Sequence, residues 1–425
     1  MYKLNSNFKK KKIINYNFKK FNTFNDKEIQ AASKVVAKGA LSSFIGNRET
    51  GLIGGVYIER FENRLKSFFK VKYAITVNSW TSGLVCAIGA IGIEPGDEVI
   101  LPTWTMTACA AAVLQWNAIP VFADIEKDTF CICPKSIIKN ISSKTKAIIV
   151  VDIFGHCANY KEIFKIAKKY RLKIICDAAQ SPGAKYFGKY AGTFADIGGL
   201  SFNYHKHIHT GEGGVLFTNN SLYAKKLKLL RNHAEAVVPE DSTKKDLINM
   251  IGNNFRMGEI EAAIGIEQLK KLNKILKKRK YLSNLLIKKL SVFKYIKLPV
   301  IKKNCSHVFY SFPIVLDYKR IKFTREHVAK ALLAEGIQGI GCGYQNLHLQ
   351  PIYQKKICYG KKGFPWSFFK SKVSYDKGIC PKAEELHSKS FMSFSISLFD
   401  LEVHDINNIY KVFKKVWNNF QLLNE

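Results

Sequence analysis

The sequence predicts an α/β protein in which a large domain with a mostly parallel sheet is followed by a smaller α+β domain. Between about residues 58 and 217, short apolar, β-branched runs alternate with helical stretches, which is typical of parallel strands joined by helices. After about residue 295, strand and helix patterns mix without that alternation. A length of 425 residues allows two or three folding units, which agrees with this division.

The strands of the large domain are expected at six short apolar runs. They are Tyr73 to Val77, Glu98 to Leu101, Pro120 to Ala123, Ala147 to Val151, Lys173 to Cys176 and Val215 to Thr218. In sheets of this kind, binding and catalytic groups gather in loops beyond the carboxyl ends of the strands. Functional residues are therefore expected in these loops.

The rest of the chain contains a helical connection and a second mixed region. From Glu259 to about Leu290, apolar residues recur at helical spacing, which predicts one or two long amphipathic helices. A strand at Val308 to Leu316 and helices at Arg325 to Glu335 and Asp405 to Phe420 are expected after it. The predicted division is a flexible basic tail (1–25), a large domain with its connecting helices (26–290) and a small domain (291–425).

The basic composition could point to a nucleic-acid partner. The net charge is +34, but the lysines are spread along the whole chain, and we find no helix-turn-helix or winged pattern. This favours a solvated basic surface and no nucleic-acid partner. A positive field still attracts anionic small molecules.

Cysteine spacing and hydropathy argue against other classes. The ten cysteines form no C-x-x-C pair, so no metal site is predicted, and their scatter through apolar segments fits a reducing compartment such as the cytoplasm. No uncharged apolar run approaches the roughly 18 residues needed to cross a bilayer, so no membrane partner is expected. The N-terminal stretch lacks the apolar core of a signal peptide.

An unusual lysine lies in the segment from Ser201 to Gly214, SFNYHKHIHTGEGG. Lys206 is flanked by His205 and His207 in a short loop, where a long aliphatic amine can project into a cavity. Taken alone, a loop lysine is more often a solvated surface group. The residues upstream favour a functional role.

Asp177 ends the apolar run IICD, where a buried strand is expected to end. A buried carboxylate is costly unless a cation pairs with it. The protonated ring nitrogen of pyridoxal 5'-phosphate (PLP) is a suitable cation, and a lysine such as Lys206 would hold the other end of that cofactor. The pair therefore suggests a PLP site.

Residues 78–82, NSWTS, follow the first predicted strand and begin a helical run. Backbone N–H groups and hydroxyls at a helix N-terminus bind phosphate readily. The same pattern also occurs as a Ser or Thr helix cap that binds nothing, and the residues alone leave both interpretations open.

Together these segments resemble the PLP-dependent sugar-nucleotide aminotransferases of the DegT/DnrJ/StrS type, which have the aspartate-aminotransferase-like fold. The resemblance covers roughly residues 38 to 420 and keeps several motifs in order. They are FENRLKSFFKVKYAITVNSWTS, GIEPGDEVILPTWTMTACAAAV, PVFADIEKDTF, IICDAAQSPGAKYFGKYAG, SFNYHKHIHTGEGG and NNFRMGEIEAAIGIEQL.

The resemblance implies roles at the ring of the cofactor. Lys206 matches the lysine that forms the Schiff base and later moves the proton between the substrate carbon and the cofactor. Asp177 matches the partner of the pyridinium nitrogen, and Gln180 the residue beside the ring hydroxyl.

It also implies roles at the phosphate of the cofactor. Thr81 and Ser82 match the phosphate-binding turn, and Ser201 matches a serine that contacts the phosphate. Asn254 matches an asparagine that reaches the phosphate from the neighbouring subunit, which predicts a homodimer with shared active sites.

Some positions depart from the pattern of the family. Trp80 stands where a small residue is usual, and a bulky ring there could crowd the phosphate turn. Either Trp104 or Met106 could cover the ring of PLP, and Asp152 replaces another polar residue, often His. Tyr310 lies in the C-terminal region that, by resemblance, closes over the substrate.

The predicted function is transfer of an amino group, from glutamate, to a keto group of a nucleotide-linked sugar in surface-glycan or amino-sugar biosynthesis. One branch of the family has His in place of the lysine and removes a hydroxyl, so Lys206 favours transamination. One alternative is a keto-cyclitol or other keto-sugar as acceptor. Another is a non-catalytic regulatory or nucleic-acid-binding protein on the same fold.

Overall fold

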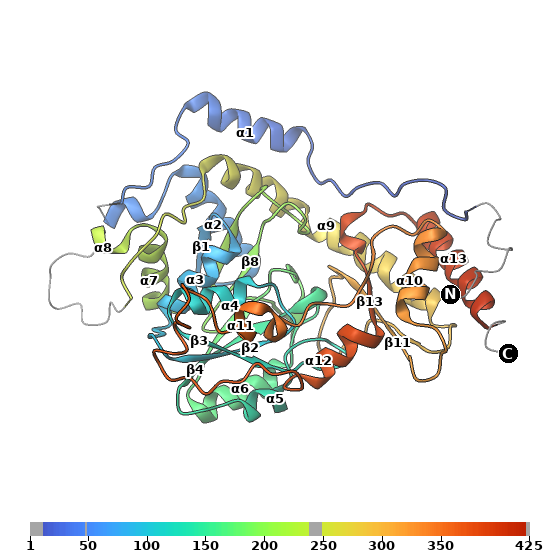
Figure 1. Ribbon diagram of the computed structural model, residues 1–425. Helices are drawn as coiled ribbons and strands as arrows, with labels where there is room; N and C mark the ends of the chain where they lie inside the picture. Colours follow the sequence, from blue (N-terminus) through green and yellow to red (C-terminus); the bar gives the residue numbers. More distant parts are fainter. Residues whose placement is uncertain (1–11, 47–48, 238–248, 422–425) are drawn as a thin grey trace.

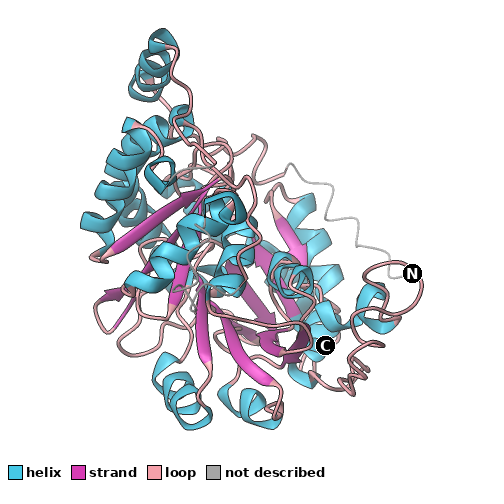
Figure 2. Cartoon of the chain, turned by 90° about the vertical axis from the view of Figure 1, so that its left-hand side faces the viewer, coloured by secondary structure: helices cyan, strands magenta, loops and turns pink. Residues whose placement is uncertain are grey.

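The protein consists of a large α/β part and a smaller C-terminal part, as the computed structural model shows for residues 12–46, 49–237 and 249–421 (Figure 1). Helices lie on both sides of the strands of the large part (Figure 2). A seven-stranded sheet forms its centre, and a four-stranded antiparallel sheet lies in the C-terminal part. The predicted fold class, mostly parallel α/β with a smaller α+β region, is confirmed.

The large sheet has the strand order β1-β9-β8-β5-β4-β2-β3. The four pairs from β8 to β3 are parallel, whereas β9 runs antiparallel to both of its neighbours. The strands are β1 (Tyr73–Val77), β2 (Glu98–Pro102), β3 (Ile119–Ala123), β4 (Thr145–Val151), β5 (Lys173–Asp177), β8 (Ile197–Ser201) and β9 (Gly214–Thr218). A separate hairpin is formed by β6 (Lys185–Tyr186) and β7 (Lys189–Tyr190).

The helices of the large part follow these strands or precede β1. They are α1 (Asp26–Lys38), α2 (Val56–Phe69), α3 (Trp80–Ala90), α4 (Ala108–Gln115), α5 (Pro134–Lys139), α6 (Tyr160–Tyr170), α7 (Ser221–Arg231) and α8 (Ala234–Val237). The C-terminal part contains β10 (Ile296–Lys297), β11 (Phe312–Leu316), β12 (Ile340–Cys342), β13 (Phe391–Phe394), α10 (Arg325–Ala334), α11 (Pro351–Gln354), α12 (Pro381–Glu385) and α13 (Val403–Gln421).

All six predicted strands of the large sheet are present, but β8 was not predicted. Its sequence, IGGLS, has two glycines and therefore a weak strand signal. A Cβ at Gly199 would lie 2.1 Å from both the Trp80 ring and the Val215 carbonyl, and one at Gly198 would lie 2.3 Å from the Gly192 carbonyl. Close packing requires these glycines. Because glycine has a low strand propensity, the sequence does not predict the strand that leads to Lys206.

The predicted connection is one helix, α9 (Glu259–Leu290), of 32 residues. Its first half packs into the core of the large part through side chains such as Leu269 and Leu272. Its last turns belong to the core of the C-terminal part through Leu286 and Leu290. The proposed boundary at residue 290 therefore falls at the end of a helix that both cores share.

Residues 12–25, which we call the N-terminal strap, pack against the C-terminal part. Ile14 and Phe18 are only 2% and 4% exposed and lie in its core. The Ile14 N–H donates to the Glu335 carbonyl at 3.1 Å, and Lys20 forms a β-bridge with Phe399. The predicted flexible tail is wrong for these residues, because two apolar side chains among the lysines find a distant core; residues 1–11 of that tail lie outside the described residues.

Residues 343–386, which we call the return segment, pack on the large part although the prediction assigned them to the small domain. Buried side chains such as Tyr353, Trp366 and Tyr375 join the core of the large part. Figure 1 shows α11 in front of the central strands and α12 between these strands and β11. Residues 291–425 are therefore not one packing unit.

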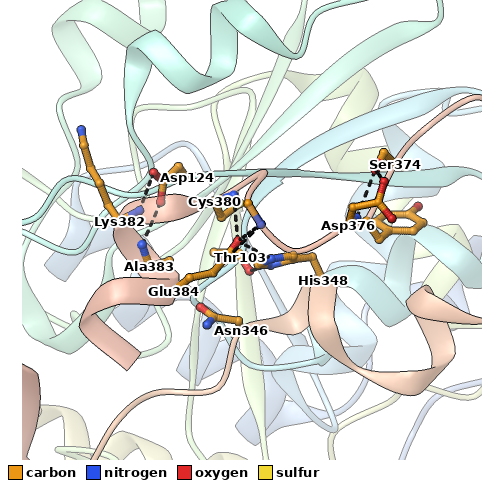
Figure 3. Close-up of polar contacts among 12 residues, drawn as sticks. Thr103, Asp124, Asn346, His348, Ser374, Asp376, Cys380, Lys382, Ala383 and Glu384 are labelled. Atoms are coloured by element: carbon orange, nitrogen blue, oxygen red, sulfur yellow. Dashed lines mark hydrogen bonds and ion pairs between the residues drawn. The ribbon is translucent and has the colours of Figure 1, made fainter. Parts of the chain in front are cut away.

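Buried polar contacts fix the return segment to the large sheet (Figure 3). His348 Nε2 donates to Glu384 Oε1 at 3.1 Å, so its Nδ1 accepts the Thr103 hydroxyl at 2.7 Å. Glu384 also accepts the Gly378 N–H at 2.8 Å. Asp124, after β3, accepts the first N–H groups of α12, with the Ala383 N–H at 3.0 Å. A carboxylate at a helix N-terminus is favourable because it satisfies free N–H groups.

Candidate active site

A cavity of about 170 Å³ lies at the carboxyl ends of β4, β5 and β8, beside the N-terminus of α3. This is where ligands bind in sheets of this kind. The cavity is lined by Ser79, Trp80, Thr81, Thr105, Met106, Ala108, Val151, Asp177, Ala179, Gln180, Ser201, Asn203, His205, Lys206 and Glu212. Of the seven predicted site residues, all but Ser82 and Asn254 are among them.

Lys206 is held in a tight loop after β8, where its N–H donates to the Asn203 carbonyl at 2.9 Å. The side chain is 8% exposed. Nζ donates to the Tyr310 hydroxyl at 3.4 Å and lies 4.7 Å from the centroid of that ring. Burial lowers the pKa of the Lys206 amine to about 8, against the opposing charge of Asp177. About a tenth of the amine is therefore neutral near pH 7, far more than for an exposed lysine, and the neutral amine is the form that acts as a nucleophile or a base.

Asp177 is the last residue of β5 and is 5% exposed. One carboxylate oxygen accepts the Ala179 N–H at 2.9 Å, and the other accepts the Cys109 thiol at 3.1 Å. Burial raises the pKa of Asp177, and these hydrogen bonds and the charge of Lys206 oppose that shift. Within the described part of the chain, no cation lies within ion-pair distance of Asp177. A protonated pyridine nitrogen would supply the missing partner, so the residues fit PLP.

The turn at the start of α3 combines a helix cap with free groups. Ser79 is the N-cap, and its Oγ accepts the Ser82 N–H at 3.1 Å. The Ser82 hydroxyl donates to Asn78 Oδ1 at 2.7 Å and lies off the cavity. Thr81 and the 7%-exposed Ser201 do line the cavity. The first N–H groups of α3 lack intrahelical acceptors, so this edge suits a phosphate.

Trp80 does not fill the phosphate turn. Its ring is 5% exposed and packs inward over Gly83 and Gly199. The indole Nε1 is buried and lies near the Asp177 carboxylate, whose pKa it helps to lower. The glycine in β8 thus accommodates the bulky residue that the sequence analysis found unusual.

Gln180 and Asn254 lie at different places. Gln180 lines the cavity and accepts the Phe154 N–H through Oε1 at 2.7 Å. Asn254 is exposed, and its side chain accepts Arg256 Nε at 2.7 Å. Its carbonyl lies 3.5 Å from Asn78 Nδ2, on the outer side of the phosphate turn. Its predicted role concerns a neighbouring subunit and stays a prediction.

The structure distinguishes the remaining candidates around the cavity. Met106 lines it and is 60% exposed, whereas Trp104 is fully buried and donates from Nε1 to Asn346 at 2.8 Å. Asp152 points away and accepts the Ala158 N–H and the Tyr160 hydroxyl at 2.8 and 3.0 Å. Met106 therefore lies at the open side of the cavity, whereas Trp104 is not among the residues that line it.

Two groups at the site carry little signal in the sequence. Cys109, from α4, lies directly against Asp177, although 68 positions separate them. Asn203 donates to Glu212 at 2.7 Å across the lysine loop, and both line the cavity. Tyr310, which the sequence analysis had linked only to the substrate, also contacts Lys206. Contacts between segments so far apart have no fixed spacing that a sequence pattern could show.

Residues 45–377 match the model of the DegT/DnrJ/EryC1/StrS aminotransferase family. The chain belongs to this family. It is a PLP-dependent aminotransferase, which agrees with the cavity, the buried lysine and the strand-end aspartate.

Named relatives in this aminotransferase family act on sugars. The chain is 33% identical to GDP-perosamine synthase of Escherichia coli O157:H7 over 302 residues, which covers 71% of this chain and 80% of that protein. It is 36% identical over 264 residues to 3-oxo-glucose-6-phosphate:glutamate aminotransferase of Bacillus subtilis (strain 168), covering 61% of this chain and 58% of that one. A DegT DnrJ EryC1 StrS aminotransferase from Brucella abortus superposes with a TM-score of 0.76 at 27% identity, over 92% and 95% of the two chains.

Proposed function

We propose that this aminotransferase moves an amino group from glutamate to the keto group of a nucleotide-linked sugar, and that Lys206 is its catalytic residue. The observation that carries the assignment of Lys206 is its buried amine, whose pKa is lowered to about 8, in the same cavity as the strand-end Asp177. The charge of Asp177 reaches this amine, and burial favours its neutral form.

Each residue has a separate task in this proposal. When bound, PLP supplies a conjugated ring that takes up an electron pair from the substrate carbon. Asp177 holds the proton on the ring nitrogen, and Lys206 carries the proton to and from the substrate carbon. Thr81, Ser201 and the N–H groups at the start of α3 hold the phosphate.

Gln180 lies beside the ring in this proposal, and the Phe154 N–H fixes its amide. The Tyr310 hydroxyl and ring contact the Lys206 amine while it is free. The low exposure of Lys206 and Asp177 keeps bulk water from the groups that exchange protons.

The names of the relatives support the substrate class. A GDP-linked product stands in the name of one relative, and a keto-sugar phosphate and glutamate stand in the name of another. The second name also favours a keto-sugar without a nucleotide as the alternative acceptor. A basic chain of net charge +34 suits either anionic substrate. Membership of an aminotransferase family argues against the non-catalytic interpretation.

The assembly and location are part of the proposal. We infer a homodimer in which Asn254 of one subunit faces the phosphate site of the other, in surface-glycan or amino-sugar biosynthesis. Exposed apolar side chains near this edge, Met106 at 60% and Ile251 at 76%, support an interface. The ten cysteines are free thiols, which supports the cytoplasm. No helix in the described part of the chain is long and apolar enough to cross a membrane.

Absorption spectra of the purified protein with PLP test Lys206 and the donor together. We expect the wild type and Lys189→Ala, a variant in the exposed hairpin, to show the band of lysine-bound cofactor and to lose it when glutamate is added. Lys206→Ala should show only the spectrum of free or loosely bound PLP. An unchanged band in Lys206→Ala would refute the role of this lysine, and a band that glutamate leaves unchanged would refute the donor.

A further inference from the structure

A second cavity, of about 390 Å³, lies where α9, the N-terminal strap and the loop after β13 meet. We call it the α9 cavity. Its charged lining consists of four cations on one face of α9 and a single acid. These are Lys271, Lys274, Lys278, Arg279 and Asp400. It shares no lining residue with the cavity of Lys206.

Arg279 is the most unusual of these cations because it is 6% exposed and, among the described residues, has no carboxylate within ion-pair distance. Its guanidinium lies 4.6 Å from the centroid of the Phe21 ring, and Nη2 donates to the Ser397 carbonyl at 3.3 Å. Nη1 is buried and has no hydrogen-bond partner within the described part of the chain. Burial lowers the pKa of Arg279 to about 10, and the charge of Asp400 opposes this shift without forming an ion pair. A buried cation without a matching anion is costly, which favours an anion at this place.

Two of the other cations already have partners. Lys271 pairs with Glu28 at 2.6 Å, and Lys278 pairs with Asp400 at 2.8 Å and with Glu402. Lys274 is exposed. Among residues 12–46, 49–237 and 249–421, neither Lys274 nor Arg279 has a carboxylate within ion-pair distance. Lys274 and Arg279 therefore leave two positive charges in the cavity without an anionic partner among these residues.

The rest of the lining is largely apolar. Two aromatic rings, Phe21 and Phe399, contribute to it together with the aliphatic side chains Ile275, Leu282, Ile396 and Leu401. Asn22 and Asn25 add amide groups that can hydrogen bond. The volume lies in the range of small-molecule pockets. A ligand that fits both surfaces has an anionic end and a flat, weakly polar end.

We propose that the α9 cavity binds a phosphate monoester that carries a planar group, of the size of a mononucleotide. The phosphate meets Lys274 and Arg279, and the planar group lies against the aromatic rings of Phe21 and Phe399. The N-terminal strap closes one wall, and its next aromatic residue, Phe24, lies 4.6 Å from the His209 ring of the lysine loop. The site is thus separate from the catalytic cavity but adjoins the loop that carries Lys206.

Calorimetric titration of the PLP-loaded protein with uridine 5'-monophosphate tests this site. Uridine serves as the uncharged comparator, and inorganic phosphate as the comparator without a planar group. We expect the monophosphate to bind at least about tenfold more tightly than either comparator, because only it engages both surfaces. Binding should weaken with added salt, as expected for partly exposed charges. Equal affinity for uridine, or no binding of the monophosphate, would overturn the proposal.

A pair of charge reversals on α9 identifies the place of binding. Lys274→Glu should weaken binding of the monophosphate about tenfold or more, whereas Lys277→Glu, an exposed neighbour outside the cavity, should leave it within about twofold. Both side chains are exposed, so both variants should keep the unfolding temperature of the wild type. Unchanged affinity in Lys274→Glu would place the ligand elsewhere, and equal loss in both variants would indicate only general attraction by a basic surface; either result contradicts the site.

Discussion

At the level of single residues, burial changes the chemistry of the charged side chains in the cavity. Lys206 is displaced toward its neutral form and Asp177 toward its protonated form, because each lies where water is scarce. Each opposes the shift of the other through its charge. PLP has an aldehyde that reacts with a neutral lysine and a basic ring nitrogen that can share a proton with a buried carboxyl. The cavity therefore has groups suited to both ends of PLP without the cofactor bound.

The lowered pKa of Lys206 predicts how fast the cofactor-free protein takes up PLP at different pH values. The neutral amine is the reactive form, so the rate should rise with pH and reach half of its maximum near pH 8, not above pH 10 as for an exposed lysine. Stopped-flow absorbance over pH 6 to 10 measures it. A half-maximum above pH 10 would show that burial does not control this amine.

Asp177→Asn should reduce kcat by about 100-fold or more, because an amide cannot hold the proton on the ring nitrogen of PLP. The cofactor should still bind, because Lys206 and the phosphate groups remain. Steady-state kinetics and the spectrum of the bound cofactor provide separate readouts. Asp196→Asn, at the opposite end of β8, is the matched control and should keep the kcat of the wild type.

Asp152 makes stability depend on pH. It is buried, and its pKa is raised to about 7 mainly by burial, although the Ala158 N–H and the Tyr160 hydroxyl oppose this. The folded protein therefore holds a proton that the unfolded chain has lost between about pH 4 and 7, so stability falls as pH rises through this window, by at most about 1.4 kcal/mol per pH unit. In Asp152→Asn the slope should become smaller. Urea unfolding of both proteins at pH 5, 6 and 7 measures it, and equal slopes would contradict the assignment.

At the level of elements, contacts between distant segments decide what the return segment does. Glu384 accepts N–H groups of Gly378 and Cys380 and the ring of His348, which in turn contacts Thr103. Thr103 and His348 are 245 positions apart, and no local pattern shows such a contact. The sequence therefore assigned the return segment to the small domain, although it packs on the large part. Local apolar patterns predict strands and helices well, but not which core a loop joins.

Glu384→Ala should lower the free energy of unfolding by about 2 kcal/mol, since it leaves Nε2 of the buried His348 and the partly buried Cys380 N–H without their acceptor. The neighbouring Glu385→Ala is the control. Glu385 is exposed and its carboxylate accepts the exposed Tyr318 hydroxyl, so its loss should cost less than about 1 kcal/mol. Urea unfolding curves compare the two. Similar losses would show that the network in Figure 3 does not hold the return segment.

For the site too, residues marked by local patterns could be predicted from the sequence, whereas roles that depend on distant segments could not. Asp177 could be placed at the cavity because it ends a predicted strand, and Thr81 because it follows another at the start of a helix. Lys206 was singled out by its loop downstream of Asp177, whereas Gln180 and Ser201 followed only from the resemblance to the family. In the structure Ser79 is the helix cap and Ser82 donates its N–H to it, so Ser82 lies off the cavity. The role of Asn254 depends on a second chain, which no pattern within one chain reveals.

At the level of the whole molecule, a shared active site can be tested by mixing inactive variants. If Asn254 serves the neighbouring subunit, a heterodimer of Lys206→Ala and Asn254→Ala has one intact site and one doubly altered site. Equal amounts of the two proteins, unfolded and refolded together, should recover about a quarter of the wild-type activity. Each variant refolded alone should stay inactive, and the same inactivity in the mixture would contradict the arrangement.

The N-terminal strap also has a consequence for how the chain matures on the ribosome. Residues 12–25 leave the ribosome long before Leu401 and Ile406, yet Ile14 and Phe18 belong to the same hydrophobic core as those two residues. Until residues such as Leu401 and Ile406 have been made, Ile14 and Phe18 lack part of the hydrophobic core that buries them. A chain that stops before Leu401 would leave Ile14 and Phe18 exposed to chaperones and proteases, so burial of the strap depends on residues made much later.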